Sequence, residues 1–253
     1  MLLAIDIGNT NTVFAVYDKD VLVESWRLRS DARHSADEYA AFLNQLFDVS
    51  GVKWKSIHKV IVSSVVPDAN FGIRRFCEKY IGVSPVFVTK DMVSIAAVID
   101  RPEDIGADRL VNAAAVKAHY NTPVIVIDFG TATTFDVVDL DGNYAGGVIA
   151  PGVNLSMAAL HQAASKLPQI SVEKPESAIG KNTVSAMQSG VYWGYVGLID
   201  RILSEIRAEI GGDVTVIATG GLAPLFAKDN AAIDIVDENL TLKGLCLIAA
   251  QHT

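Results

Sequence analysis

Two short stretches of the chain join an aspartate to a glycine and to a group of small hydroxyl-rich residues. The first, "IDIGNTNTVF", runs from Ile5 to Phe14, and the second, "IDFGTATTFD", runs from Ile127 to Asp136. Each follows an apolar segment of the kind that forms a buried strand. Aligned without a gap, the two stretches pair Asp6 with Asp128, Gly8 with Gly130 and Thr12 with Thr134. The repetition predicts a chain built from two related halves.

The residue types in these stretches suit a phosphate group. Gly8 permits a turn in which most side chains would clash, and the residues after it present amides and hydroxyls. Backbone N–H groups in such a turn can surround an anion, and an aspartate at the end of the strand can orient a hydrated cation beside it. The alternative is a pair of ordinary β-hairpin turns, which the recurrence after two buried strands disfavours.

Two other nucleotide motifs have no support. The segment "IGKNT" at Ile179–Thr183 contains a Gly-Lys pair, but Asn182 stands at the Ser/Thr position and the upstream glycine of a Walker motif is missing. A GxGxxG sequence is also missing, so a dinucleotide-binding Rossmann domain is not indicated.

The apolar periodicity predicts a series of strands and helices that would position the two turns. In the first half we expect three strands, a helix over Ser35–Phe47 capped by Ser35 and Glu38, a strand, a second helix, a short strand and an Ala-rich helix that starts near Gly106. In the second half we expect three strands, two long helical segments, a strand that ends in a Gly-Gly turn, a short strand and a C-terminal helix. In the first half the strands are expected at 2–7, 12–17, 21–28, 59–67 and 84–89, and the second helix at 69–82. In the second half the three strands are expected within 124–152, the two long helical segments at 152–167 and 183–210, the strand that ends in Gly-Gly at 213–221, the short strand at 231–236 and the C-terminal helix at 242–251.

Both halves therefore follow one order, which predicts α/β units with mixed sheets and flanking helices. The hairpins are antiparallel, and the later strands need crossover connections. We place the domains at residues 1–118 and 119–253, and expect a ligand in the cleft between them.

Composition excludes several classes of protein. Half of the 253 residues are apolar, a fifth are charged, and the net charge is −8, which argues against a nucleic-acid-binding surface. The two cysteines, Cys77 and Cys246, are far apart in apolar segments, as in a reducing compartment. The chain starts with a strand rather than a signal peptide, and its apolar runs are too short to cross a bilayer. We expect a soluble cytoplasmic protein without membrane contact.

The motifs together resemble a known family. Two DxGxT hairpins and a late strand that ends in Gly-Gly resemble the superfold of sugar kinases, Hsp70 and actin, which implies two duplicated ribonuclease-H-like domains. Within it, the order of "DIGNTNT", "GADR", "DFGTATT", "GGVIAPG", "GKNTVSAMQSG" and "TGG" along the chain is similar to type III pantothenate kinases. The resemblance implies ATP-dependent phosphorylation of pantothenate to 4′-phosphopantothenate, the first step of coenzyme A biosynthesis. Sugar and acetate kinases carry large insertions that do not fit in this length.

The resemblance also implies roles for single residues. Asp108 of "GADR" would be the general base for the pantothenate hydroxyl. Asp6 would organise Mg²⁺ through water, and Asp128 would bind a monovalent cation, K⁺ or NH₄⁺. Arg109 has the chemistry to pair with an anionic oxygen of either substrate. The residues expected to contact ATP are Asp6, Ile7, Gly8, Asn9, Thr10, Asn11, Thr12, Val13 and Thr131, and those expected to contact pantothenate are Gly106, Ala107, Asp108, Arg109 and Thr183.

Some residues keep two interpretations. Thr183 matches a substrate-binding threonine and is also a suitable N-cap for the following helix. Ile99 stands where many family members carry a tyrosine, so an aromatic contact to the substrate is lost or supplied elsewhere. We interpret the aromatic group Tyr192, Trp193 and Tyr195 as core or as the contact surface of the homodimer that the family forms. The five histidines have no metal-ligand spacing and are interpreted as surface or structural residues: His34, His58, His119, His161 and His252.

The sequence also allows a function of a different class, that of a non-catalytic accessory or regulatory protein on the same fold. Some relatives of these kinases are described as transcriptional accessory factors, and loss of the "DIGNT" or "GADR" aspartate would favour such a role. Asp6, Asp108 and Asp128 are all present, which favours the enzyme.

Overall fold

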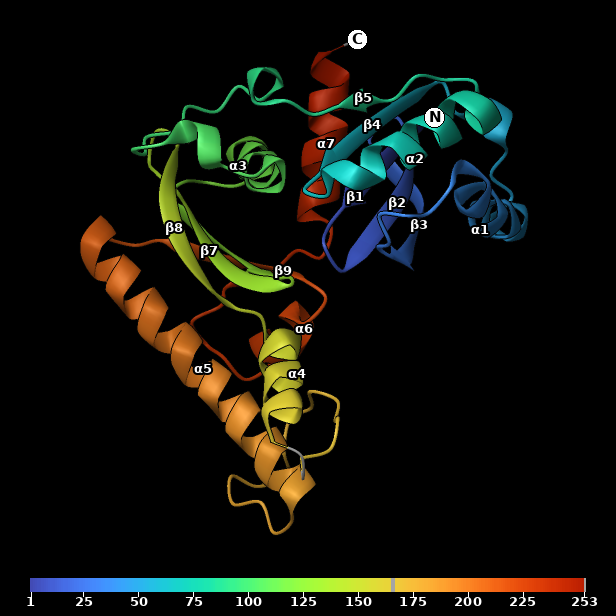
Figure 1. Ribbon diagram of the computed structural model, residues 1–253. Coiled ribbons are helices and arrows are strands. Elements are labelled where there is room, and N and C mark those ends of the chain that lie inside the picture. The colour runs from blue at the N-terminus through green and yellow to red at the C-terminus, as the bar shows by residue number, and fades with distance from the viewer. Residues whose placement is uncertain (165–166, 253) are drawn as a thin grey trace. The chain divides into compact units, whose positions relative to one another are not determined.

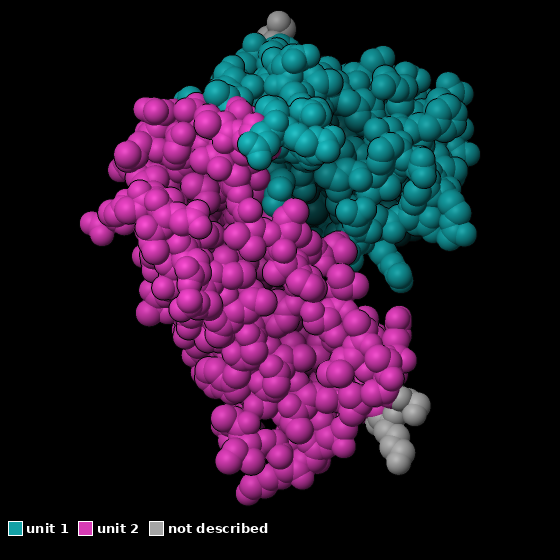
Figure 2. Space-filling view, turned by 60° about the vertical axis from the view of Figure 1, so that its left-hand side comes forward, with its two compact units in different colours: residues 1–96, 100–119, 239–253 teal, residues 97–99, 120–238 magenta. Residues whose placement is uncertain are grey.

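A computed structural model describes residues 1–164 and 167–252 (Figure 1). The chain forms two compact units, coloured separately in Figure 2. Unit 1 contains Met1–Ala96, Asp100–His119 and the C-terminal segment from Asn239, and unit 2 contains Ala97–Ile99 and Tyr120–Glu238. Each unit is built around a five-stranded mixed sheet, as the duplicated motifs predict. Within the described part of the chain, no helix is both long enough and apolar enough to cross a membrane.

The sheet of unit 1 has the order β3-β2-β1-β4-β5. Strands β1 (Leu2–Ile7), β2 (Asn11–Asp18) and β3 (Val21–Arg29) form an antiparallel meander, whereas β4 (Lys59–Ser64) lies parallel to β1 and β5 (Val86–Phe87) lies parallel to β4. The parallel pairing brings the carboxyl ends of β1 and β4 to the same edge of the sheet.

Helices cover both faces of this sheet. One face packs against α1 (Ala36–Ser50) and α2 (Asn70–Phe76), which continues as a π-helical turn over Cys77–Ile81. The other face carries α3 (Ala107–His119) and α7 (Leu240–Gln251). Leu3, Ile5 and Ile7 belong to the core on the first face. Because side chains alternate along a strand, Ala4 and Asp6 point to the face that carries α3 and α7.

The capping signal of α1 is confirmed in atomic detail. Ser35 accepts a hydrogen bond from the Glu38 N–H, and the Glu38 carboxylate accepts one from the Ser35 N–H at 2.7 Å. This reciprocal arrangement satisfies two N–H groups at the start of the helix. Gly51, in the left-handed conformation, ends it.

Unit 2 repeats the plan with the strand order β10-β9-β6-β7-β8. Strands β6 (Val124–Phe129), β7 (Ala132–Val138) and β8 (Tyr144–Pro151) form the meander, and β9 (Thr215–Gly220) and β10 (Ile235–Val236) continue the sheet in parallel. In the core of unit 2, α5 (Thr183–Ile210) packs against this sheet. Helix α4 (Val153–Ala163) and the short α6 (Ala223–Ala227) also contribute side chains to this core.

The C-terminal helix belongs to unit 1, whereas the sequence-based division places it with residues 119–253. α7 packs against α3, and a Cβ on Gly244 would overlap the main-chain oxygen of Val111. Thr241 also donates a hydrogen bond to the buried amide oxygen of Asn112 at 2.7 Å. An apolar helix at the end of a chain carries no local signal for the sheet that it covers.

Candidate active site

The first Asp-x-Gly turn links β1 to β2 and exposes its tip. Gly8 donates its N–H to the Asn11 carbonyl at 3.0 Å, which closes the turn, and Asn9, Thr10 and Asn11 are exposed. A Cβ on Gly8 would lie 3.1 Å from the Asn11 carbonyl oxygen, so the turn has little room for a side chain there. The tip therefore offers amides and hydroxyls to solvent, as a phosphate site requires.

A serine outside the predicted motif holds this turn. Ser30, the residue after β3, donates its hydroxyl to the Gly8 carbonyl at 2.6 Å and its main-chain N–H to the Thr10 carbonyl at 2.9 Å. Its Oγ also lies 2.9 Å from the hydroxyl of the buried Thr12. The residues that flank Ser30 in sequence gave no signal of this role.

The second turn is one residue shorter than the first, which corrects the gap-free alignment of the two motifs. In unit 1 the strands pair Ile7 with Thr12, but in unit 2 they pair Phe129 with Thr133. Burial agrees with this register, because Thr12 and Thr133 are both buried, whereas Thr134 is half-buried. Thr133, not Thr134, is therefore the structural counterpart of Thr12. A single-residue deletion in a turn cannot be detected when the residues after it are all small and polar.

Asp128 lies at the carboxyl end of β6 beside the end of β9. A Cβ on Gly220 would lie 2.8 Å from Asp128 Oδ1, and Gly220 adopts a φ of +88°. The parallel register also sets Asp128 beside Thr219, as it sets Asp6 beside Ser63 in unit 1. The structure thus brings the second aspartate together with the predicted Gly-Gly turn.

The motif "GADR" lies where α3 begins. The half-buried Asp108 occupies the first turn of the helix, and its Oδ1 accepts the main-chain N–H of Arg109 at 2.9 Å. A Cβ on Gly106 would lie 2.5 Å from this oxygen, so a larger residue would displace the carboxylate. Burial raises the pKa of Asp108, and the nearby Arg109 opposes that rise only in part.

Asp108 and Asp6 lie on the same side of the unit 1 sheet. Asp6 points to the face covered by α3, and the loop before α3 contacts the end of β4, where a Cβ on Gly106 would lie 3.8 Å from Val65 Cγ1. Val65 in turn donates its N–H to the Ile7 carbonyl at 3.0 Å. The first turn and the "GADR" loop therefore converge at one edge of unit 1.

The structure assigns the cap of α5 to a different residue. Asn182, not Thr183, is the N-cap, and it accepts the Ser185 N–H at 2.9 Å while Ser185 reciprocates. The exposed Thr183 is the first residue of the helix, so the capping interpretation of Thr183 is wrong. Within the described part of the chain its hydroxyl makes no hydrogen bond, which leaves it available for another contact.

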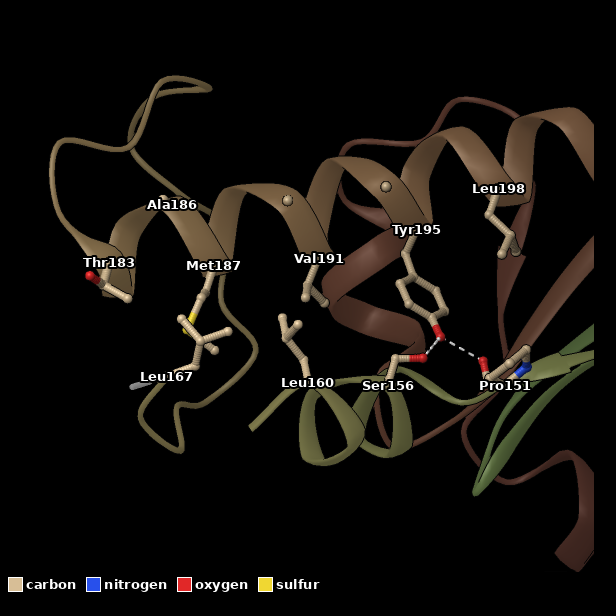
Figure 3. A pocket seen from close by; sticks show the side chains of 12 residues that line it. Pro151, Ser156, Leu160, Leu167, Thr183, Ala186, Met187, Val191, Tyr195 and Leu198 are labelled. Atoms are coloured by element: carbon tan, nitrogen blue, oxygen red, sulfur yellow. Dashed lines mark hydrogen bonds between the residues drawn. The ribbon is translucent and has the colours of Figure 1, made fainter. Parts of the chain in front are cut away.

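Thr183 lies at one end of a groove between α4 and α5 (Figure 3). The groove has a volume of about 800 Å³ and is mostly apolar. Tyr195 reaches from α5 across to α4 and the end of β8, because its hydroxyl donates to the Pro151 carbonyl at 2.6 Å and lies 2.8 Å from Ser156 Oγ. The other lining residues are Leu160, Leu167, Ala186, Met187, Gly190, Val191, Gly194 and Leu198.

The aromatic group of α5 divides between core and surface. Tyr192 and Tyr195 are buried against the sheet, and Tyr192 donates its hydroxyl to Asp229 at 2.6 Å. Trp193 is 41% exposed. Ile99 belongs to unit 2, where the segment before it pairs with β8 and a Cβ on Gly146 would lie 3.6 Å from Ile99 Cγ2.

The expected cation sites rest on single carboxylates. Among residues 1–164 and 167–252, no three His, Cys, Asp or Glu side chains gather into a metal-binding group. Two histidines make hydrogen bonds to main-chain oxygens, His161 to Leu167 at 2.6 Å and His252 to Met92 at 2.8 Å, in keeping with a structural role.

Sequence comparison gives the family. The profile described as type III pantothenate kinase matches residues 2–205. The chain belongs to the type III pantothenate kinase family. A curated family member from Paramagnetospirillum magneticum is 53% identical over 255 residues, an alignment that covers 100% of this chain and 98% of the relative.

Solved structures that resemble the fold are much more distant in sequence. A protein from Campylobacter jejuni assigned to the Baf family of transcriptional activators aligns with a TM-score of 0.61 at 19% identity, over 99% of this chain and 98% of that one. An inorganic polyphosphate/ATP-glucomannokinase from Arthrobacter aligns with a TM-score of 0.51 at 16% identity, over 100% and 99% of the two chains. These similarities confirm the sugar kinase superfold and carry no information about the substrate.

Proposed function

We propose that the chain phosphorylates pantothenate to 4′-phosphopantothenate at the expense of ATP, the first step of coenzyme A biosynthesis. The observation that carries this function is the position of Asp108, a half-buried carboxylate on the same side of the unit 1 sheet as Asp6 and its phosphate turn. Phosphoryl transfer requires an acceptor hydroxyl, a base and neutralisation of phosphate charge. Unit 1 contains candidates for the base and for phosphate binding.

The first turn fits the phosphates of ATP. The exposed amides and hydroxyls of Asn9, Thr10 and Asn11 would bind phosphate oxygens, with Ile7, Gly8, the buried Thr12 and Val13 forming the turn and the strands beside it. Asp6 and the buried Ser63, which are paired across β1 and β4, supply oxygen donors of the kind that Mg²⁺ prefers. Mg²⁺, when bound, neutralises phosphate charge, and Asp6 would hold it through water.

Asp108 would act as the general base. Its carboxylate takes the proton of the pantothenate hydroxyl as that oxygen bonds to the γ-phosphorus, and ADP leaves with the electron pair of the broken bond. Burial near the start of α3 raises the pKa of Asp108, which makes it a better proton acceptor than an exposed aspartate. Arg109 would pair with the pantothenate carboxylate or the transferred phosphoryl group, and Gly106 and Ala107 would line the acceptor site.

Unit 2 contains the candidates for the monovalent-cation site and for further substrate contacts. Asp128 and Thr219, on neighbouring strands, present oxygen donors that suit K⁺ or NH₄⁺. Thr131, which is exposed in the second turn, would contact the nucleotide, and Thr183 would contact pantothenate.

A homodimer forms part of the proposal. The groove between α4 and α5 is apolar, and the side chains of Leu155, Leu160, Val184 and Trp193 on the same two helices are 39–50% exposed. Gly190 and Gly194 in this groove would allow a helix of a second copy to approach closely. We also retain the cytoplasmic location, because the thiols of Cys77 and Cys246 are free and buried.

The accessory-protein alternative is not favoured. The structural likeness to a Baf family protein is at 19% identity and shows the fold alone, whereas the curated relative at 53% identity is a kinase. Asp6, Asp108 and Asp128 are retained as well.

A coupled ADP-release assay with pantothenate tests the function. We expect pantothenate-dependent ADP release with Mg²⁺ and K⁺ or NH₄⁺, and a much lower rate with Na⁺ alone. Absence of pantothenate-dependent release under every cation would refute the kinase. Release that is indifferent to the monovalent cation would refute only the role of Asp128.

A further inference from the structure

We infer that Ser30 is a positioning residue for the phosphate turn, with its hydroxyl holding the turn in the conformation that binds the phosphates of ATP. The inference rests on the proposed kinase function. Ser30 lies outside both Asp-x-Gly motifs and outside every residue set expected to contact a substrate.

The direction of the hydrogen bonds follows from the chemistry of the groups. The Gly8 carbonyl can only accept, so the single hydroxyl hydrogen of Ser30 is donated to it at 2.6 Å. Thr12 must then donate its own hydroxyl hydrogen to Ser30 Oγ across 2.9 Å. The hydrogen bonds form a directed chain from the Thr12 hydroxyl through the Ser30 hydroxyl to the Gly8 carbonyl. This chain fixes Gly8 and Thr12, the two residues that flank the exposed tip.

These bonds set the orientation of two peptide planes. In a planar trans peptide, the C=O of one residue and the N–H of the next point in opposite directions. Ser30 binds the carbonyls of Gly8 and Thr10, so the N–H groups of Asn9 and Asn11 point away from Ser30. The carbonyl oxygens of Gly8 and Thr10, which would repel a phosphate, thus point toward Ser30. The N–H donors of the following residues point away from Ser30, where they can bind a phosphate.

Unit 2 shows that the hydroxyl is not needed to build the hairpin. Gly152 occupies the place of Ser30 and makes the same main-chain bond, from its N–H to the Thr131 carbonyl at 3.1 Å. A Cβ there would overlap that carbonyl oxygen. The same meander therefore forms with no side chain at this position, and the Ser30 hydroxyl serves the conformation of the first turn.

The test compares Ser30→Ala, Ser30→Thr and Ser25→Ala. Ser25 lies on β3, the strand that ends just before Ser30, and its hydroxyl has no hydrogen bond among the described residues, which makes it the matched control. Ser30→Ala loses the hydrogen bond that the hydroxyl donates to Gly8 and the one that it accepts from Thr12. We therefore expect the Kd and KM for ATP to rise roughly three- to tenfold. The KM for pantothenate should change less than twofold, and Ser30→Thr should restore ATP affinity.

Three outcomes would overturn the role of Ser30: an ATP affinity of Ser30→Ala equal to that of Ser25→Ala, an equal rise of both KM values, or no rescue by threonine. If Ser30→Ala does not fold, Ser30→Gly takes its place, because unit 2 already accommodates glycine there. Direct ATP binding is measured without pantothenate, so failure of the wild-type protein to phosphorylate pantothenate would refute the proposed function and leave the test of Ser30 intact.

Discussion

The carboxylate of Asp128 lies directly against Gly220, on the neighbouring parallel strand. A Cβ on Gly220 would be 2.8 Å from Asp128 Oδ1 and 2.7 Å from the Phe129 carbonyl oxygen. The φ of +88° at Gly220 also disfavours any other residue. The glycine therefore sets the position of the carboxylate as well as the turn after β9.

Substitution of Gly220 should damage both stability and cation use. We expect Gly220→Ala to lower the free energy of unfolding by about 1–3 kcal/mol, because it adds strain and close contacts. The K⁺ concentration for half-maximal activity should rise as Asp128 is displaced. Urea unfolding and K⁺ titration of ADP release measure the two effects. Gly197→Ala is the control, because a Cβ there meets no described atom within 4 Å apart from the backbone of its own helix turn, and alanine suits a helix interior.

Local signals in the sequence predicted most elements. The range of α5, the start of α3 and the Ser35–Glu38 cap are confirmed because apolar spacing and caps act within a few residues. The short strands β5 and β10 are only two residues long, since their extent depends on the partner strand rather than on their own composition.

Asp108→Asn should separate activity from stability. If Asp108 is the base, the variant should lose roughly 10²–10⁴-fold in kcat and still bind ATP and pantothenate. Its thermal stability should equal or exceed that of the wild type at pH 7, because burial raises the pKa of Asp108 and makes its charged form costly in the folded state. Near-wild-type turnover would exclude Asp108 as the base.

The pH dependence of kcat/KM for pantothenate should report the same carboxylate. A base must be deprotonated, so activity should fall as the pH drops through the pKa of Asp108. Because that pKa is raised above 3.8, the acid limb should lie at a higher pH than for an exposed aspartate. The free energy of unfolding should change in the opposite direction. The stabilisation from the protonated carboxyl of Asp108 is full below the pKa of the unfolded state and is lost as the pH rises through the pKa of the folded state. A pH–rate profile and thermal melts at each pH measure both.

Long-range relations account for what the sequence analysis missed. Ser30 is 22 residues from Gly8, and only the register of β2 with β3 brings the two together. The shorter second turn was hidden because Thr133 and Thr134 are chemically identical neighbours. The residue after the third strand distinguishes the two meanders, because it is Ser30 in unit 1 and Gly152 in unit 2.

The two aspartates of the duplicated turns should respond differently to cations. We expect Asp128→Asn to abolish the preference for K⁺ or NH₄⁺ over Na⁺ and to leave the Mg²⁺ requirement in place. Asp6→Asn should instead raise the Mg²⁺ concentration needed for half-maximal rate. Cation titrations of ADP release on both variants measure this. The same response from both variants would contradict separate roles.

The apolar groove between α4 and α5 is the predicted contact surface of the proposed homodimer. Leu160, which lines the groove and is 39% exposed, should tolerate a charge in a monomer but not in a buried interface. We therefore expect the wild type to be the proposed dimer and Leu160→Glu to be a monomer of unchanged fold, measured by light scattering and circular dichroism. Leu140→Glu is the control, because Leu140 is 74% exposed on the turn between β7 and β8, outside the groove. A dimeric Leu160→Glu variant, or a monomeric wild type, would show that the groove has another use.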